Sequence, residues 1–223
     1  MKSTILVFIL IFLLPLASCK ENPAKTHFKN AHELFQEGNY IESLSEYAEG
    51  LRLDPSNAEN YIRYGNVFED TGDYDSAIKQ YKKALEIRPK HINARIEMAQ
   101  AYRKMGNLPE AIKLMKEAVE MKPGEGWIRN VYGNILQESG NIKSALGEYE
   151  EAVRLEPNEP EFRTDLANTY LKLERRSDAL IHYRYAFSLV DGLSGEKSKR
   201  DYKKEAQFAK DMIELLTKPT PIE

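Results

Sequence analysis

The sequence has little of the chemistry that disulfide frameworks, metal centres and nucleic-acid binding require. One cysteine among 223 residues cannot form a disulfide within the chain. The four histidines, at positions 27, 32, 91 and 182, lack the His-Glu-x-x-His spacing of a zinc site. A net charge of −3 provides no overall positive field for a phosphate backbone. We therefore expect no metal, no other cofactor and no nucleic-acid partner.

Signatures of catalysis are missing as well. The sequence contains no glycine-rich phosphate loop and no Gly-x-Ser-x-Gly nucleophile elbow. Aspartate and glutamate pairs are numerous, but on charged helices they are most simply solvated faces and i,i+4 partners. We therefore predict no catalytic residue and do not expect an enzyme.

The chain has only one long apolar run, residues 5–14, which follows Lys2. This run is shorter than the roughly 18–20 residues that a helix needs to cross a bilayer. The chain turns polar directly after Cys19, as is typical of a secretory signal peptide over residues 1–18. The alternative is an uncleaved membrane span.

The four residues Leu16-Ala17-Ser18-Cys19 resemble the lipobox of bacterial lipoproteins. The resemblance implies that Cys19 receives a diacylglycerol on sulfur and becomes the first mature residue, often with an N-linked acyl chain such as palmitate. Two or more acyl chains anchor a protein stably in a membrane. We expect an extracytoplasmic protein of the bacterial cell envelope, tethered by residues 19–23. Lys20 after the cysteine favours the outer membrane where two membranes are present.

Several residue types recur every 34 residues, which is typical of a repeat architecture. The recurring prolines are Pro55, Pro89, Pro123 and Pro157, and the recurring glycines are Gly38, Gly72, Gly106 and Gly140. Alanines at 77, 111, 145 and 179, and at 84, 118, 152 and 186, keep the same step. Each glycine is expected to end one helix in a left-handed conformation, and each proline to end the next. The Asn or Asp after each glycine is expected to cap the second helix, with capping boxes at Asn39–Glu42 and Asn107–Glu110.

At this period the chain resembles the tetratricopeptide repeat family, which has small residues at repeat positions 8, 20 and 27 and aromatic residues near 11 and 24. The five repeats are 24–57, 58–91, 92–125, 126–159 and 160–193, and Glu174 replaces the turn glycine in the last. The resemblance implies an all-α, right-handed superhelical solenoid of five helix-turn-helix repeats. Residues 194–223 follow as a C-terminal capping helix and tail, with an apolar stripe at 202, 206, 209, 213 and 216.

In this family helix A lines the concave face, chiefly at repeat positions 2, 5, 9, 12 and 13. Position 9 holds His32, Asn66, Gln100, Asn134 and Asn168, nearly a ladder of amides that suits an extended peptide backbone. The alternative is that concave positions are simply polar. Position 5 holds Phe28, Ile62, Ile96, Asn130 and Thr164, so its apolar members either receive a partner's hydrophobic side chains or pack internally. Trp127, at position 2, is either an anchor or a filler between repeats.

These features together predict a membrane-anchored scaffold that binds a protein or peptide in envelope assembly or secretion, similar in layout to pilotins and outer-membrane assembly factors. Only six steps separate Cys19 from Lys25, at most about 20 Å of chain, so the partner is expected to be membrane-proximal. The alternative function is an extracytoplasmic receptor for a small ligand or glycan, with Trp127 as a stacking platform.

Overall fold

The computed structural model describes residues 22–192 and 202–218. The expected signal peptide and lipidated Cys19 therefore lie outside the described residues. No helix in the described ranges is both long and apolar enough to cross a membrane.

The chain divides into two compact units, Met1–Pro55 and Ser56–Glu223. The described part of the first is one hairpin, α1 (Pro23–Gln36) and α2 (Tyr40–Leu53). The second contains the hairpins α3 (Ala58–Asp70) with α4 (Tyr74–Ile87), α5 (Ile92–Lys104) with α6 (Leu108–Met121), α7 (Gly126–Glu138) with α8 (Ile142–Leu155), and α9 (Pro160–Lys172) with α10 (Arg176–Asp191). A last helix, α12 (Lys203–Thr217), follows. This confirms the predicted helical-repeat fold class.

We call the first helix of each repeat helix A and the second helix B. The turn glycine that ends helix A has positive φ, which confirms the predicted left-handed conformation. Gly38, Gly72, Gly106 and Gly140 have φ of 80°, 81°, 78° and 81°. In the fifth repeat Glu174 makes the same turn at φ 61°, although its side chain disfavours this region. The left-handed conformation costs a non-glycine residue about 1–2 kcal/mol, so the fifth turn forms at the expense of stability.

The predicted capping boxes at Asn39 and Asn107 are wrong, although both residues stand at the N-cap. Neither side chain accepts a hydrogen bond from the first turn. Asn39 instead donates from Nδ2 to Glu37 Oε2 over 3.1 Å, within the turn itself. Only Asp73, a carboxylate without a competing donor, caps its helix B through the Ser76 amide at 3.0 Å.

Small residues at repeat position 8 let the two helices of a hairpin cross closely around a tyrosine. A Cβ added at Gly65 would stand 2.5 Å from Tyr81 Cε1, and one at Gly133 would stand 2.6 Å from Tyr149 Cε1. Both tyrosines are fully buried. The glycines therefore provide the space that the rings fill, which is the close packing expected of a protein interior.

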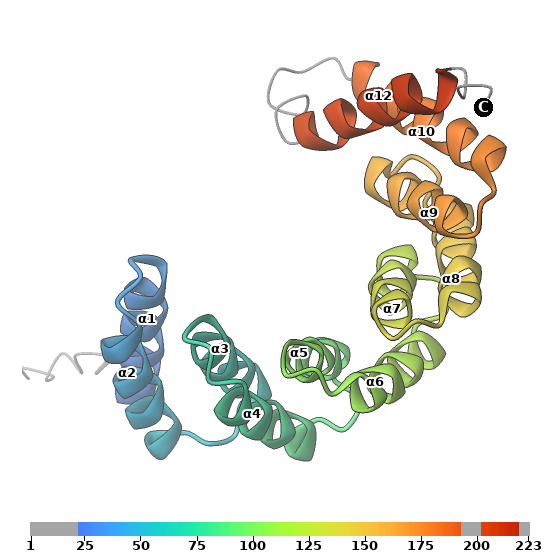
Figure 1. Cartoon of the computed structure of the whole chain (residues 1–223). Coiled ribbons are helices and arrows are strands. Elements are labelled where there is room, and N and C mark those ends of the chain that lie inside the picture. The colour runs from blue at the N-terminus through green and yellow to red at the C-terminus, as the bar shows by residue number, and fades with distance from the viewer. Residues whose placement is uncertain (1–21, 193–201, 219–223) are drawn as a thin grey trace, which may run out of the picture. The chain divides into compact units, whose positions relative to one another are not determined.

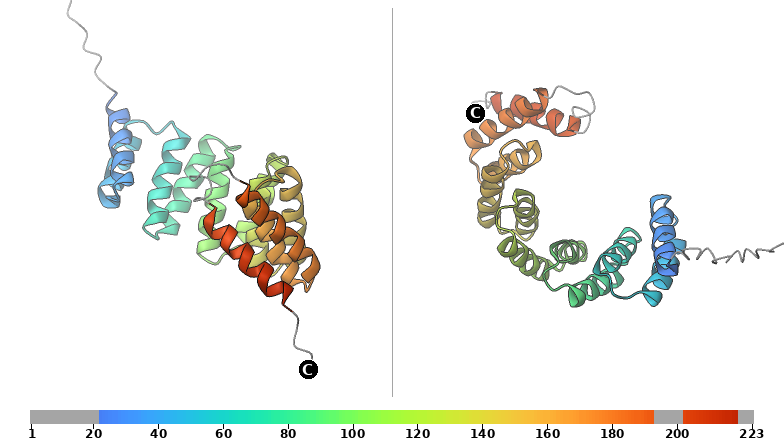
Figure 2. Two further views of the ribbon diagram at one scale, coloured as in Figure 1. Left: turned by 90° about the horizontal axis from the view of Figure 1, so that it is seen from above. Right: turned by 180° about the vertical axis from the view of Figure 1, so that it is seen from behind.

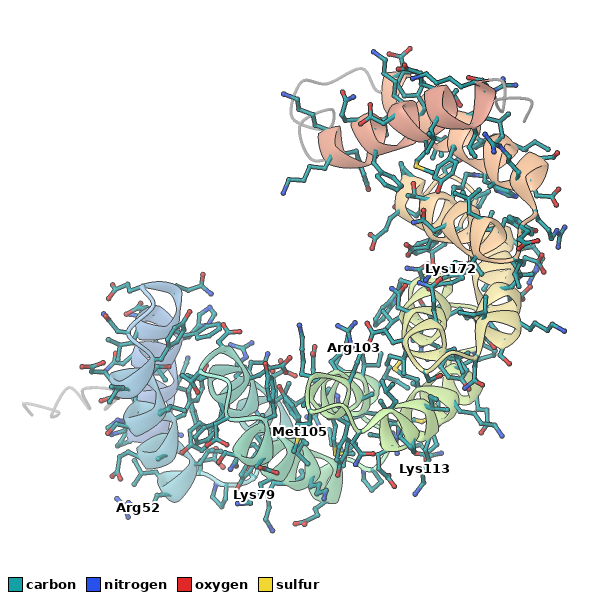
Figure 3. The ribbon with its side chains drawn as sticks, in the orientation of Figure 1. Arg52, Lys79, Arg103, Met105, Lys113 and Lys172 are labelled. Atoms are coloured by element: carbon teal, nitrogen blue, oxygen red, sulfur yellow. The ribbon has the colours of Figure 1, made fainter. Side chains whose placement is uncertain are left out.

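Within the second unit the helices form two curved layers (Figure 1). Helices α3, α5, α7 and α9 lie on the inner side of the curve, and α4, α6, α8 and α10 on the outer side. Helix α12 packs on α10 and α9 at the C-terminal end, and the views in Figure 2 show the same order. Arg103 lies on the inner side, whereas Lys79 and Lys113 lie on the outer side (Figure 3). We call the inner side of α3, α5, α7 and α9 the inner face.

Candidate binding surface on the inner face

Three asparagines of the predicted ladder are held by buried tyrosines. The hydroxyls of Tyr149 and Tyr183 donate to the Oδ1 atoms of Asn134 and Asn168, at 2.6 and 2.5 Å. The Tyr81 hydroxyl lies 2.9 Å from both Asn66 Oδ1 and Glu69 Oε2, which share its one hydrogen. Each tyrosine follows its asparagine by 15 residues.

A tyrosine hydroxyl is protonated at neutral pH and can donate, and burial moves its pKa further above that range. Burial raises the pKa of Tyr183 to about 12, and the pKa values of Tyr81 and Tyr149 also lie above the ordinary value. Since each asparagine oxygen is engaged, the Nδ2 hydrogens remain for a ligand. The sequence predicted that these amides both donate hydrogen bonds to a partner and accept them from it. In the structure their oxygens are occupied, so their role toward a partner is mainly to donate.

The third repeat lacks this tyrosine–amide pair, because Met115 stands at the repeat position that holds a tyrosine in the neighbouring repeats. Gln100 stands at position 9 there, and its Oε1 is buried without a hydrogen-bond partner among the described residues. The thioether of Met115 has no hydrogen to donate. In the first unit, described by itself, His32 is exposed at the same repeat position.

The residues at position 5 of the second unit are buried rather than open to a partner. Ile62, Ile96, Asn130 and Thr164 are between 3% and 8% exposed, and both isoleucines belong to the hydrophobic core. In the first unit Phe28 packs beside Tyr47, with ring centroids 6.4 Å apart, and against Gly50. The structure thus favours the internal-packing alternative for the apolar members of this column.

Trp127 is 40% exposed and belongs to neither core cluster of the second unit. It lies in the first turn of α7, where Glu156 Oε1 accepts hydrogen bonds from the backbone amides of Gly126 and Trp127 at 2.7 and 3.2 Å. These bonds hold the first turn in place and leave much of the ring accessible.

Sequence reasoning missed two carboxylates at repeat position 6 of helix A, Glu97 and Asp165. Burial raises the pKa of Glu97 to about 7, and the nearby charge of Glu69 adds to the shift. Burial also raises the pKa of Asp165 to about 6, although the hydrogen bond from Asn130 Nδ2, 3.0 Å long, opposes it. The only signal in the sequence is their separation of two full repeats, since 165 − 97 is 68.

Other polar side chains of the inner face already bond between repeats. Arg103 Nη1 lies 2.6 Å from Glu138 Oε1. Thr169 Oγ1 lies 3.1 Å from Gln137 Oε1 and 2.8 Å from the carbonyl oxygen of Asp165, and these two acceptors share its one hydrogen. These pairs join α5 to α7 and α7 to α9. Neither pair uses the asparagine amides of the ladder.

A larger hollow of the second unit lies elsewhere, beside the segment that connects α4 to α5. It encloses about 730 Å³, and its described lining is the six consecutive residues 88–93. A ligand site normally has polar groups converging from several elements. This hollow lacks that convergence within the described ranges, so we place the candidate site on the inner face.

Comparison with known proteins supports the repeat assignment. Models described as tetratricopeptide repeat match residues 28–92 and 68–135, and one described as TPR repeat matches 133–174. Comparison with curated protein sequences gave no match.

Among solved structures, MamA 41-end from Desulfovibrio magneticus RS-1 has a TM-score of 0.70 at 19% identity, covering 78% of this chain and 98% of its own. YrrB, described as a TPR protein with an unusual peptide-binding site, has a TM-score of 0.60 at 22% identity, with coverages of 83% and 94%. TTC0263, a thermophilic TPR protein of Thermus thermophilus, has a TM-score of 0.59 at 20% identity, with coverages of 82% and 99%. The chain is therefore a protein built of tetratricopeptide repeats.

Proposed function

We propose that this protein is a lipid-anchored, non-enzymatic scaffold of the cell envelope that binds an extended segment of another protein on its inner face. The observation that carries the proposal is the set of asparagine amides, at 66, 134 and 168, whose oxygens are held by tyrosine hydroxyls. Fixed N–H donors match the carbonyl oxygens of a peptide backbone regardless of its side chains. The peptide-binding site described for YrrB is consistent with this use of the fold.

Preorganisation is what separates these amides from ordinary surface asparagines. A free side chain loses rotamer entropy when it binds, about 0.5–1.5 kcal/mol for each immobilised group. The tyrosine hydroxyls have already restricted these three side chains, so a partner does not have to order them. Trp127, exposed at the start of α7, adds an aromatic surface of the kind enriched at binding hot spots.

Photocrosslinking in cells tests the face of the molecule that is used. A photoreactive residue in place of Lys172, exposed at the C-terminal end of the inner-layer helix α9, is expected to give a discrete crosslinked product. The same residue in place of Lys113, which is exposed on the outer side, is the matched control and is expected to give none. The double variant Asn66→Ala, Asn134→Ala should reduce the Lys172 product about tenfold or more, because two hydrogen bonds are lost.

Equal crosslinking from both positions would argue against binding on the inner face. So would a crosslinking yield that the double variant leaves unchanged. The emission of Trp127, the sole tryptophan, serves as a separate check. If it shifts with sugars but not with peptides, the chain is better explained as a glycan receptor.

The anchor is tested at Cys19, which lies outside the described residues. Cys19→Ser removes the sulfur that would carry the diacylglycerol, and with it the proposed attachment to lipid. We expect the variant to move from the membrane fraction to the soluble fraction and to lose incorporation of labelled palmitate. Persistence in the membrane fraction would indicate an uncleaved span at residues 1–18.

A further inference from the structure

A small cleft lies between α9 and α12, at the C-terminal end of the second unit where Figure 1 shows these helices together. It encloses about 260 Å³ and is lined by Glu161, Thr164, Asp165, Asn168, Lys204 and Phe208. Sites for drug-sized ligands usually enclose about 300–1,000 Å³. This cleft is therefore of a size to hold one side chain of a larger partner.

The most deeply placed charge in the cleft is the carboxylate of Asp165. No lysine, arginine or histidine nitrogen of the described ranges lies within 4 Å of it, so it has no ion-pair partner there. Glu161 lies on the same wall and adds negative charge, whereas the positive charge of Lys172, which makes no ion pair with Asp165, partly offsets it. A partly buried carboxylate without a paired cation is unfavourable, and a cationic ligand would relieve that cost.

Asn130 holds the carboxylate in one orientation. Its side chain is 97% buried, since only 3% is exposed, and its Nδ2 donates to Asp165 Oδ2. Its own Oδ1 is buried and has no partner among the described residues. The equivalent residues of the two preceding repeats are the apolar Ile62 and Ile96. A buried amide at this position costs stability, and the bond to Asp165 is the function that the geometry shows for it.

The opposite wall of the cleft carries an aromatic ring. Phe208 of α12 is 42% exposed, and its ring meets Tyr183 edge-on with centroids 6.0 Å apart. A carboxylate facing an accessible ring suits a guanidinium group, which bonds carboxylates through two N–H groups and stacks on aromatic faces. The chain itself uses such stacking, with Arg163 over Tyr185 at 3.6 Å. A lysine ammonium lacks the planar, stacking surface.

We propose that this cleft receives an arginine side chain of the bound partner, with its guanidinium on Asp165 and stacked against Phe208. The proposal rests on the proposed function, because the arginine belongs to the segment that the asparagine amides hold. Asn168 belongs both to the row of asparagine amides and to the lining of the cleft, so the two sites adjoin each other. Lys204 is exposed on α12 and makes no ion pair within the described ranges, so its flexible stem can turn away from an incoming cation.

Titration of the isotope-labelled, full-length chain in detergent with N-acetyl-arginine-N-methylamide tests the proposal. NMR signals of Thr164, Asn168 and Phe208 are expected to shift in a saturable manner. The neutral isostere N-acetyl-citrulline-N-methylamide should bind about tenfold more weakly or worse, because it makes no charge-assisted hydrogen bonds. Equal binding of the two probes would overturn the assignment. Tighter binding of free L-arginine than of the capped probe would overturn the assignment to a protein side chain.

Variants locate the bound probe. Asp165→Asn should weaken arginine binding about tenfold or more, while Phe208→Leu, which keeps an apolar wall, should weaken it about threefold. Asp211→Asn is the matched control because it removes the same charge from an exposed position of α12. Binding that Asp165→Asn and Phe208→Leu leave unchanged would overturn the proposal.

The two proposals can fail separately. Crosslinking from Lys172 without binding of the arginine probe would reject only the arginine site. Binding of the probe without crosslinking would reject only the proposed binding of an extended segment.

Discussion

Replacing Tyr149 with alanine is expected to lower the free energy of unfolding of the second unit by about 3–5 kcal/mol, the range for removing a large buried aromatic side chain. The ring is fully buried, fills the space beside Gly133, and supplies the hydroxyl that holds Asn134. The surrounding helices cannot collapse fully into the vacated volume, so a cavity remains. Urea unfolding followed by circular dichroism measures the change.

Two control variants distinguish the contribution of the ring from that of the hydroxyl, and the effect of a buried ring from that of an exposed one. Tyr149→Phe keeps the ring and loses only the bond to Asn134, so its cost should be about 1 kcal/mol. Tyr185→Ala removes a 42% exposed ring on the outer layer and should cost about 1 kcal/mol, chiefly through the loss of its stacking with Arg163. If Tyr149→Ala and Tyr185→Ala cost the same, the tyrosine at repeat position 24 does not hold the hairpin together.

Glu97→Gln is expected to stabilise the protein at pH 8 and to have little effect at pH 4. The folded protein raises the pKa of Glu97 from 4.5 to about 7 through burial and the charge of Glu69. Below pH 4.5 the side chain is neutral in both folded and unfolded chains, and above pH 7 it is charged in both. Stability is therefore lost as the pH rises between these values, when the folded chain holds a proton that the unfolded chain releases.

The expected gain at pH 8 is about 1–3 kcal/mol, since the full shift corresponds to about 3 kcal/mol and partial exposure reduces it by solvent screening. Unfolding free energies of the variant and the parent chain, measured from pH 4 to pH 8, give the difference directly. Glu120→Gln is the control, because Glu120 is exposed on the neighbouring helix α6. A difference between Glu97→Gln and the parent that does not change with pH would contradict the raised pKa.

Glu97 and Asp165, the two carboxylates with raised pKa values, occupy equivalent repeat positions but have different surroundings. Asp165 accepts a hydrogen bond from Asn130 of the preceding repeat, whereas the residue equivalent to Asn130 before Glu97 is Ile62, which has no polar group to offer. Burial raises the pKa of both carboxyl groups, and only Asp165 has a hydrogen bond that opposes this effect. The sequence alignment of repeats contains this difference, but its effect depends on burial.

The sequence by itself determined the hairpins, their turns and their order. The glycines at 34-residue spacing predicted the left-handed turns, because the allowed backbone conformations of a residue depend on its own side chain. The small residues at repeat position 8 and the large ones at position 24 are visible in the sequence, but their contact depends on how the two helices cross. The capping boxes failed because a side chain in a tight turn has several competing partners.

Only the tertiary structure decided which groups of the inner face remain available to a partner. The tyrosine hydroxyls use the oxygens of the ladder, the core contains Ile62 and Ile96, and α12 closes a cleft over Asp165. These outcomes depend on atoms about 3 Å apart that belong to residues 15 to 40 positions apart, or on burial by several helices at once. Hydrogen bonding and desolvation act through such distances in space, so the repeat pattern located the surface and the packing determined its chemistry.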